Sequence, residues 1–141
     1  MRFISSFSKS IIILASVVML VIGSLVFSSP AEAVEHVIKM GPNKKPPYVF
    51  SPSEVTVQPG DTVKFIQVNS RHNVMFDTSS KKIKDRTQRK IFKKLSHRKL
   101  LKKKNDQIFI TIPDNAKPDT YDFFCTPHKS SGMKGKLIVK S

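Results

Sequence analysis

The chain has a single cysteine among its 141 residues, Cys125, so no disulfide can form within it. Acidic residues are also scarce, with 10 Asp and Glu against 25 Lys and Arg, which gives a formal net charge of +15. Such an excess indicates a negatively charged partner or surface and says little about the fold. No internal repeat is present, which leaves one ordinary domain as the expectation for a chain of this length.

A twin-arginine motif is missing from the N-terminus, although the first 33 residues have the other marks of an export signal. Arg2 and Lys9 precede an apolar run over residues 11–27, and residues 31–33 (Ala-Glu-Ala) fit the small-x-small cleavage rule. The sequence predicts a signal peptide over residues 1–33, cleaved after Ala33, and a chain that crosses the membrane unfolded. An uncleaved anchor is the alternative, because the run is just short of the ~20 residues that span a bilayer.

Short β-prone segments joined by Pro, Gly, Asn and Asp turns fill the predicted mature domain, residues 34–141. The alternation of apolar and polar residues is clearest in 62–69 and 107–112. The pattern predicts an all-β, antiparallel β-sandwich. The expected strands are residues 34–40, 48–50, 55–57, 62–69, 107–112, 120–125 and 135–140.

Basic residues gather in one segment, where 13 of the 24 residues from 81 to 104 are Lys or Arg and only Asp85 is acidic. A short amphipathic helix is expected within it, interrupted by Ser96 and His97, or else an irregular segment. The apolar residues at helical spacing are Ile91, Phe92 and Leu95, which Leu100 and Leu101 could extend.

Three side chains that bind soft metals lie within nine residues: Cys125, His128 and Met133. Thiolate and thioether ligands suit reduced copper, and imidazole also accepts the oxidised ion. Pro127 stiffens the loop between the first two, and Gly132 allows a tight turn before Met133. An exported protein with one unpaired cysteine is unusual unless the thiol is occupied, and a metal would occupy it.

A blue-copper site needs a second histidine from a separate strand. His72 is the best candidate because it follows a well-marked strand and precedes Asn73 and an apolar triplet. His36 lies inside the first expected strand and His97 among basic residues, so ordinary surface or hydrogen-bonded roles suit both better. Taken alone, His72 fits such a role nearly as well.

Other interpretations of the cluster are weaker. Cys125 alone could be a small buried hydrophobe, and Met133 could fill the core. A nucleophilic Cys-His pair usually lies far apart in sequence, with an Asn or Asp that orients the histidine. Zinc usually recruits more Cys or His and has little use for a thioether. Copper agrees best with ligand softness and spacing.

Residues 121–136 (Tyr-Asp-Phe-Phe-Cys-Thr-Pro-His-x4-Met-x-Gly-Lys) resemble the C-terminal copper loop of the plastocyanin family. Residues 72–77 (His-Asn-Val-Met-Phe-Asp) resemble the segment with its first copper histidine, and the runs at 50–53, 59–63 and 95–100 match in order. The resemblance covers residues 34–141. It implies a cupredoxin-like Greek-key β-sandwich and one copper ion with the ligands His72, Cys125, His128 and axial Met133.

The resemblance also implies a role. Asn73 would tie the two ligand loops together, and the protein would be a soluble, non-enzymatic, monomeric one-electron carrier in the thylakoid lumen of a cyanobacterium. It would take electrons from cytochrome f of the cytochrome b6f complex and deliver them to photosystem I, in transient contact with these membrane complexes. Electrons would pass through the exposed ring of His128 within an apolar patch.

Several positions depart from the family pattern. Arg71 stands where Pro is common, Ser130 and Ser131 replace a small Gly-Ala pair, and Phe124 replaces a tyrosine found in many members. The region that is acidic in plant members is basic here, either as a solvated face or as a docking surface for acidic partners. The expected docking residues are Arg71, Tyr48, Pro127, Lys81, Lys82, Lys93, Lys94, Lys102, Lys103 and Lys104.

Two other classes of function compete with electron transfer. A periplasmic copper-binding protein could store or deliver the metal without redox turnover. A cationic secreted protein could bind nucleic acid or anionic lipid through residues 81–104, but only Phe92 places an aromatic ring among these lysines, against the stacking pattern of single-strand binders. No nucleic-acid partner is therefore expected.

Overall fold

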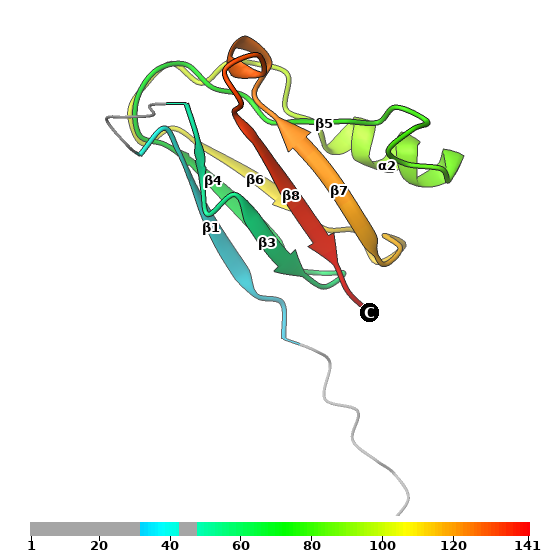
Figure 1. Ribbon diagram of the computed structural model, residues 1–141. Helices are drawn as coiled ribbons and strands as arrows, with labels where there is room; N and C mark the ends of the chain where they lie inside the picture. The colour runs from blue at the N-terminus through cyan, green and yellow to red at the C-terminus, as the bar shows by residue number, and fades with distance from the viewer. Residues whose placement is uncertain (1–31, 43–47) are drawn as a thin grey trace, which may run out of the picture. The chain divides into compact units, whose positions relative to one another are not determined.

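The computed structural model describes residues 32–42 and 48–141, and residues 33–141 form one compact unit. Two four-stranded sheets face each other, with strand orders β2-β1-β4-β6 and β3-β8-β7-β5 (Figure 1). The strands are β1 (Glu35–Met40), β2 (Phe50–Ser51), β3 (Glu54–Val57), β4 (Thr62–Gln67), β5 (Met75–Phe76), β6 (Gln107–Thr111), β7 (Asp119–Phe124) and β8 (Lys134–Val139). The helices are α2 (Arg86–Leu95) and the 3₁₀ turn η1 (Thr126–His128).

The predicted β-sandwich is confirmed, but its sheets are mixed rather than purely antiparallel. β1 pairs parallel to β4, and β3 pairs parallel to β8, whereas the other neighbours pair antiparallel. Neither parallel pair is linked by a hairpin. Between β1 and β4 the chain leaves the first sheet at β2, forms β3 in the second and returns as β4, and β3 is separated from β8 by β4 to β7. Alternation along a strand cannot reveal such pairings.

Alternation along the strands builds the core between the sheets. In β4, Val63, Phe65 and Gln67 are buried, and the intervening side chains are more exposed, as expected of a period of two. The ring of Phe123 on β7 packs edge-on against Phe65, with 5.5 Å between ring centroids, and against Phe50, at 4.8 Å. These rings join the two sheets.

The expected amphipathic helix is present as α2, which lies beside β5 and β7 (Figure 1). Asp85 caps it by accepting the backbone N–H groups of Thr87 and Gln88. Phe92 is fully buried and stacks on Tyr121 of β7 at 3.6 Å. The helix ends at Leu95, and the hydroxyl of the next residue, Ser96, donates to the Phe92 carbonyl and accepts the Phe76 N–H of β5.

The predicted signal peptide lies almost wholly outside the described residues, so its cleavage stays a prediction. Within the described part of the chain, no helix has the length and apolar character needed to cross a membrane.

Loops at one end of the sandwich come from segments far apart in the sequence. The loop after β4 and the loop holding η1, drawn green and orange, both lie at the top of Figure 1. The C-terminus lies at the other end, where Asp61 accepts hydrogen bonds from the backbone N–H groups of Val34 and Gln58 and contacts His36. The candidate metal ligands all lie on the loops of the first end.

Candidate metal centre

Three predicted ligands, far apart in sequence, meet at this end of the sandwich. The Nδ1 atoms of His72 and His128 each lie 3.5 Å from Cys125 Sγ and 3.2 Å from each other. His72 and Cys125 are fully buried, and His128 is partly exposed. Three potential donor atoms therefore surround one point with a single face toward solvent.

The loop after β7 is shaped by its own backbone. Cys125 directly follows β7, and its carbonyl accepts the His128 N–H; Pro127 lies in the η1 turn between them. The Met133 N–H donates to the His128 carbonyl, and the Cys125 N–H donates to the Met133 carbonyl, at 3.1 and 3.2 Å. Gly132 permits this return with φ = +85°, in the left-handed region that favours glycine. The backbone of Met133 is therefore hydrogen-bonded to both other ligands of the loop, and its side chain is fully buried.

The loop that carries His72 is held by the segment after α2. The His72 carbonyl accepts the N–H of Leu101, and the His72 N–H donates to the side-chain oxygen of Gln67. Gln67 in turn donates to the carbonyl of Lys103. The backbone on both sides of the ligand ring is therefore fixed before any metal binds.

Asn73 bridges the two ligand loops. Its side-chain oxygen accepts the backbone N–H of Thr126 at 2.8 Å, and its Nδ2 donates to the Thr126 hydroxyl at 3.1 Å and to the Arg98 carbonyl at 3.0 Å. The side chain is almost fully buried, so these bonds are protected from water. Three segments are joined through one amide.

Burial sets the protonation state of the ligands. Burial, with repulsion from His128, lowers the pKa of His72 to about 4, and burial lowers the pKa of His128. Both rings are therefore neutral at pH 7, the form that binds metals. Burial raises the pKa of the Cys125 thiol, against smaller opposing effects of the backbone N–H groups of Asn73 and His128.

The donor set fits copper. Two imidazole nitrogens face each other beside a sulfur, an arrangement in which a cation satisfies all three atoms. Two nitrogens, one thiolate and a thioether suit both oxidation states of copper, and hard cations prefer oxygen.

The other predicted residues lie around this end or along the basic segment. Tyr48 stacks on His128, with ring centroids 3.9 Å apart and planes 8° apart. Arg71 and Pro127 are exposed, as are the predicted docking lysines. His36 pairs with Asp61 at the opposite end, and His97 forms a backbone bridge with Val74, so neither joins the cluster.

Sequence reasoning missed two residues that shape the site, Gln67 and Thr126. Gln67 is a polar residue on the inward face of a central strand, and that contradiction of the strand pattern was the available signal. Thr126 gave no signal, since its role depends on Asn73, 53 positions away. Only the folded chain brings them together.

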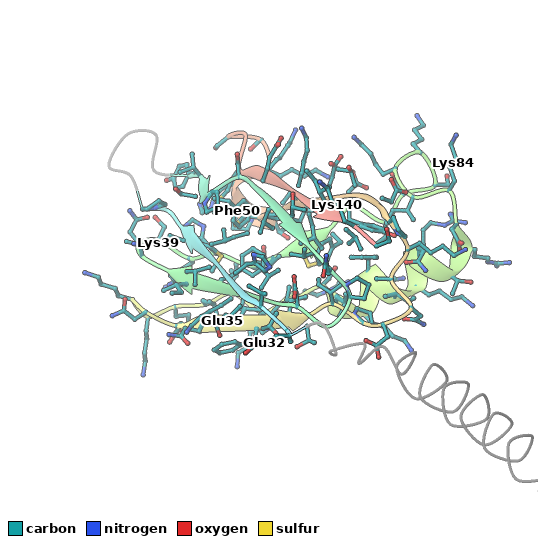
Figure 2. The ribbon with its side chains drawn as sticks, turned by 90° about the horizontal axis from the view of Figure 1, so that it is seen from below. Glu32, Glu35, Lys39, Phe50, Lys84 and Lys140 are labelled. Atoms are coloured by element: carbon teal, nitrogen blue, oxygen red, sulfur yellow. The ribbon has the colours of Figure 1, made fainter. Side chains whose placement is uncertain are left out.

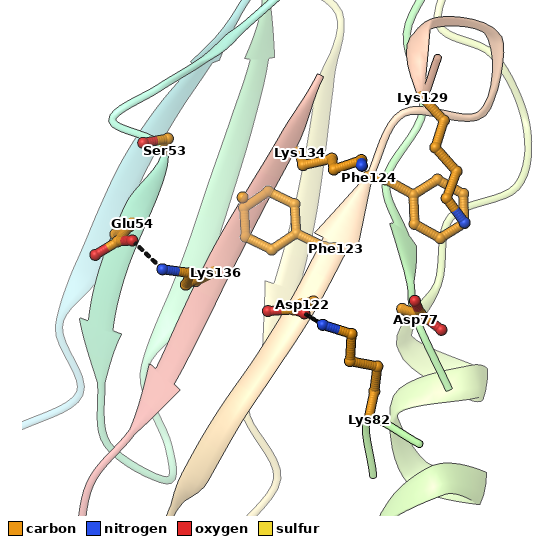
Figure 3. A pocket seen from close by; sticks show the side chains of 11 residues that line it. Ser53, Glu54, Asp77, Lys82, Asp122, Phe123, Phe124, Lys129, Lys134 and Lys136 are labelled. Carbon is orange, nitrogen blue, oxygen red and sulfur yellow. Dashed lines mark hydrogen bonds and ion pairs between the residues drawn. The ribbon is translucent and has the colours of Figure 1, made fainter. Parts of the chain in front are cut away.

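Beside the ligand loop, a cavity of about 260 Å³ lies against β7 and β8 (Figure 3). The ammonium group of Lys129 covers the ring of Phe124, with 3.9 Å between the nitrogen and the ring centroid. Lys82 pairs with Asp122 at 2.7 Å across the same cavity. Lys136 also pairs with Glu54, at 2.6 Å, so two of the four lysines that line the cavity have an acidic partner.

Comparison with known proteins agrees with this geometry. Residues 36–140 match the model of the copper-binding proteins of the plastocyanin/azurin family. A plastocyanin of a Synechococcus strain is 37% identical over 129 residues, covering 85% of this chain and 86% of the relative. The plastocyanin of Prochlorothrix hollandica is 35% identical over 142 residues, covering 99% and 100%.

The fold comparison gives the same result. The oxidised form of plastocyanin from Dryopteris crassirhizoma superposes with a TM-score of 0.63 at 32% identity, covering 74% of this chain and all of that one. The copper ligands are accordingly His72, Cys125, His128 and Met133, and the protein is an electron carrier. This chain belongs to the plastocyanin/azurin family of copper-binding proteins.

Proposed function

We propose that the protein carries single electrons from cytochrome f of the cytochrome b6f complex to photosystem I. The relatives that it matches over nearly its whole length are cyanobacterial plastocyanins. The observation that carries the proposal is the convergence of His72, Cys125 and His128 on one point close to the surface. Copper, when bound there, supplies a one-electron couple.

His128 is the exit for electrons in this proposal. Its ring alone among the three converging ligands is partly exposed, and Pro127 beside it is exposed as well. Tyr48 covers one face of the ring and adds an aromatic surface next to it. Tyr48 and Pro127 therefore belong to the contact surface for both partners, which suits the small areas of transient redox encounters.

Asn73 keeps the ligand positions constant in both redox states. Its hydrogen bonds join the loops of His72 and Cys125, so the donor atoms move little when the electron count changes. Small movement keeps the barrier to transfer low.

The basic segment and Arg71 steer the partners. Lys81, Lys93, Lys94, Lys102, Lys103 and Lys104 are exposed, and none of their ammonium groups forms an ion pair with another described residue. Lys82 contributes less because Asp122 offsets its charge. Acidic surfaces on the donor and acceptor would be attracted over about one Debye length.

Location follows from the same proposal. The chain is exported by residues 1–33, cleaved after Ala33, and works as a monomer in the thylakoid lumen, peripheral to the membrane. The apolar run and the Ala-Glu-Ala site support export.

Flash-induced reduction of photosystem I particles by the reduced protein tests the proposal. We expect reduction whose rate rises with protein concentration and falls as sodium chloride is added. A rate indifferent to salt would remove the steering role and leave the carrier role intact. No electron delivery, with copper bound but no reversible couple, would instead favour copper storage.

A further inference from the structure

A hollow of about 430 Å³ lies along the exposed side of α2, away from the copper ligands. Thr78, Arg86, Arg89, Lys90 and Lys93 line it. The four basic residues are spaced three, four and seven positions from the first, so they share one face of the helix. Figure 2 shows basic side chains around this helix, with Lys84 pointing away from the sandwich just before it.

No acidic side chain lines this hollow, in contrast to the cavity of Figure 3. There Asp122 pairs with Lys82 and Glu54 with Lys136. Asp85, the only acid of the basic segment, caps the helix and pairs with Lys117 at 2.7 Å. The charges in the hollow thus have no anionic partner among the described residues.

Arg89 carries the most specific feature. Its Nε atom is buried, yet it has no hydrogen-bond partner in the described part of the chain. Buried guanidinium donors are normally satisfied, and each unpaired one needs an explanation. Like charges at positions i and i+4, here Arg86 with Lys90 and Arg89 with Lys93, also disfavour the helix. An anion bound in the hollow would relieve this repulsion and could accept from the guanidinium N–H groups of Arg89 that face it, while the buried Nε holds no competing partner among the described residues.

We propose that this hollow binds an oxyanion of the phosphate or sulfate class. The fork of an arginine matches such an anion through two parallel hydrogen bonds, and lysines add point charges around it. The Thr78 hydroxyl at the rim can donate to a further oxygen. The anion can be free in solution or be the headgroup of an anionic lipid. The site does not depend on copper, and it shares only Lys93 with the lysines proposed to steer the electron partners.

Titration with sodium phosphate, at an ionic strength held constant with sodium chloride, tests the proposal. We expect saturable changes in the backbone amide NMR shifts of residues 78 and 86–93. Arg89→Lys keeps the charge but removes the guanidinium fork and should weaken phosphate binding about tenfold. Lys39→Gln removes one charge from an exposed residue on β1 and should leave binding unchanged.

A second arm separates the two sources of the anion. One outcome is that the protein co-sediments with phosphatidylglycerol vesicles and not with phosphatidylcholine vesicles, less so in Arg89→Lys, while free phosphate fails to bind. That result would assign the site to a lipid headgroup. Phosphate or vesicle binding that is equal in the parent and Arg89→Lys, or equally weakened in Lys39→Gln, would overturn the proposal. So would the absence of binding in both arms. Arg86→Lys serves the same purpose if Arg89→Lys does not fold.

Discussion

At the scale of single residues, one buried polar side chain secures each end of the sandwich. Asp61 joins the start of β1 to the turn before β4, and Asn73 joins the two ligand loops. Each is buried and makes several hydrogen bonds, so neither can be replaced without leaving donors unsatisfied. Replacing Asp61 should change the pH dependence of unfolding, and replacing Asn73 should change the release of copper.

Asp61→Asn should lower the free energy of unfolding by about 1–3 kcal/mol at pH 7. Burial raises the pKa of Asp61, but the N–H groups of Gln58 and Val34, and His36, together outweigh it and hold the pKa below its usual value. The stabilisation is then complete above the unfolded-state pKa of about 3.9 and is lost as pH falls through the lower folded-state pKa. Urea unfolding of both proteins from pH 7 to pH 3 would measure the difference, and a gap that widened in acid would contradict this assignment.

Asn73→Ala removes the bridge between the ligand loops. We expect a loss of about 1–3 kcal/mol in unfolding free energy and faster release of copper to a chelator, because His72 and Cys125 are then free to separate. Asn115→Ala, at an exposed position in the turn before β7, is the control. Equal copper release from both variants would mean that the bridge does not hold the site.

At the scale of elements, α2 is attached to the sandwich mainly by one aromatic side chain. Phe92 is buried between Tyr121 of β7, at 3.6 Å, and Phe76 of β5, at 5.1 Å. Gln88 adds hydrogen bonds to Asn115, Lys117 and Tyr121. The helix thereby brings the segment that follows it against the His72 loop.

Phe92→Ala should cost about 3–5 kcal/mol in unfolding free energy, since it leaves a cavity between three elements. Chemical denaturation followed by far-UV circular dichroism measures the loss, with the exposed Lys94→Ala as control. A loss below 1 kcal/mol would show that α2 is not part of the cooperative unit.

The secondary-structure elements could be predicted from local sequence patterns, but their pairing and contacts could not. Alternation in 62–69 and 107–112 and the spacing of Ile91, Phe92 and Leu95 are local signals. These segments form β4, β6 and α2, although β4 ends two residues earlier than predicted and β6 one residue earlier. The parallel pairing of β1 with β4, the hydrogen bonds of Gln67 and the stacking of Tyr48 on His128 depend on contacts between distant residues. Ligand chemistry is visible in one chain segment, whereas ligand geometry requires the fold.

At the scale of the whole molecule, positive charge dominates. The net charge of +15 includes the crowded cations of residues 81–104, and the ion pairs among the described residues compensate few of them. Self-repulsion of this kind favours the expanded chain, and salt screens it.

Thermal stability should therefore rise with salt. We expect the Tm of the protein to increase between 10 mM and 500 mM sodium chloride, because screening relieves repulsion more than it weakens exposed ion pairs. Over this range the Debye length falls from about 30 Å to below about 8 Å. Differential scanning calorimetry measures this shift. A lower Tm at high salt would show that the ion pairs outweigh the repulsion.

The optical spectrum of the protein, titrated with Cu(II) and then reduced with ascorbate, tests the central claim most directly. The convergence of Cys125, His72 and His128 predicts one intense blue thiolate-to-copper band per chain, which bleaches on reduction, returns on oxidation and is absent from Cys125→Ser. A colourless or irreversible complex, or a band that persists in Cys125→Ser, would contradict the assignment of this site as a copper electron-transfer centre.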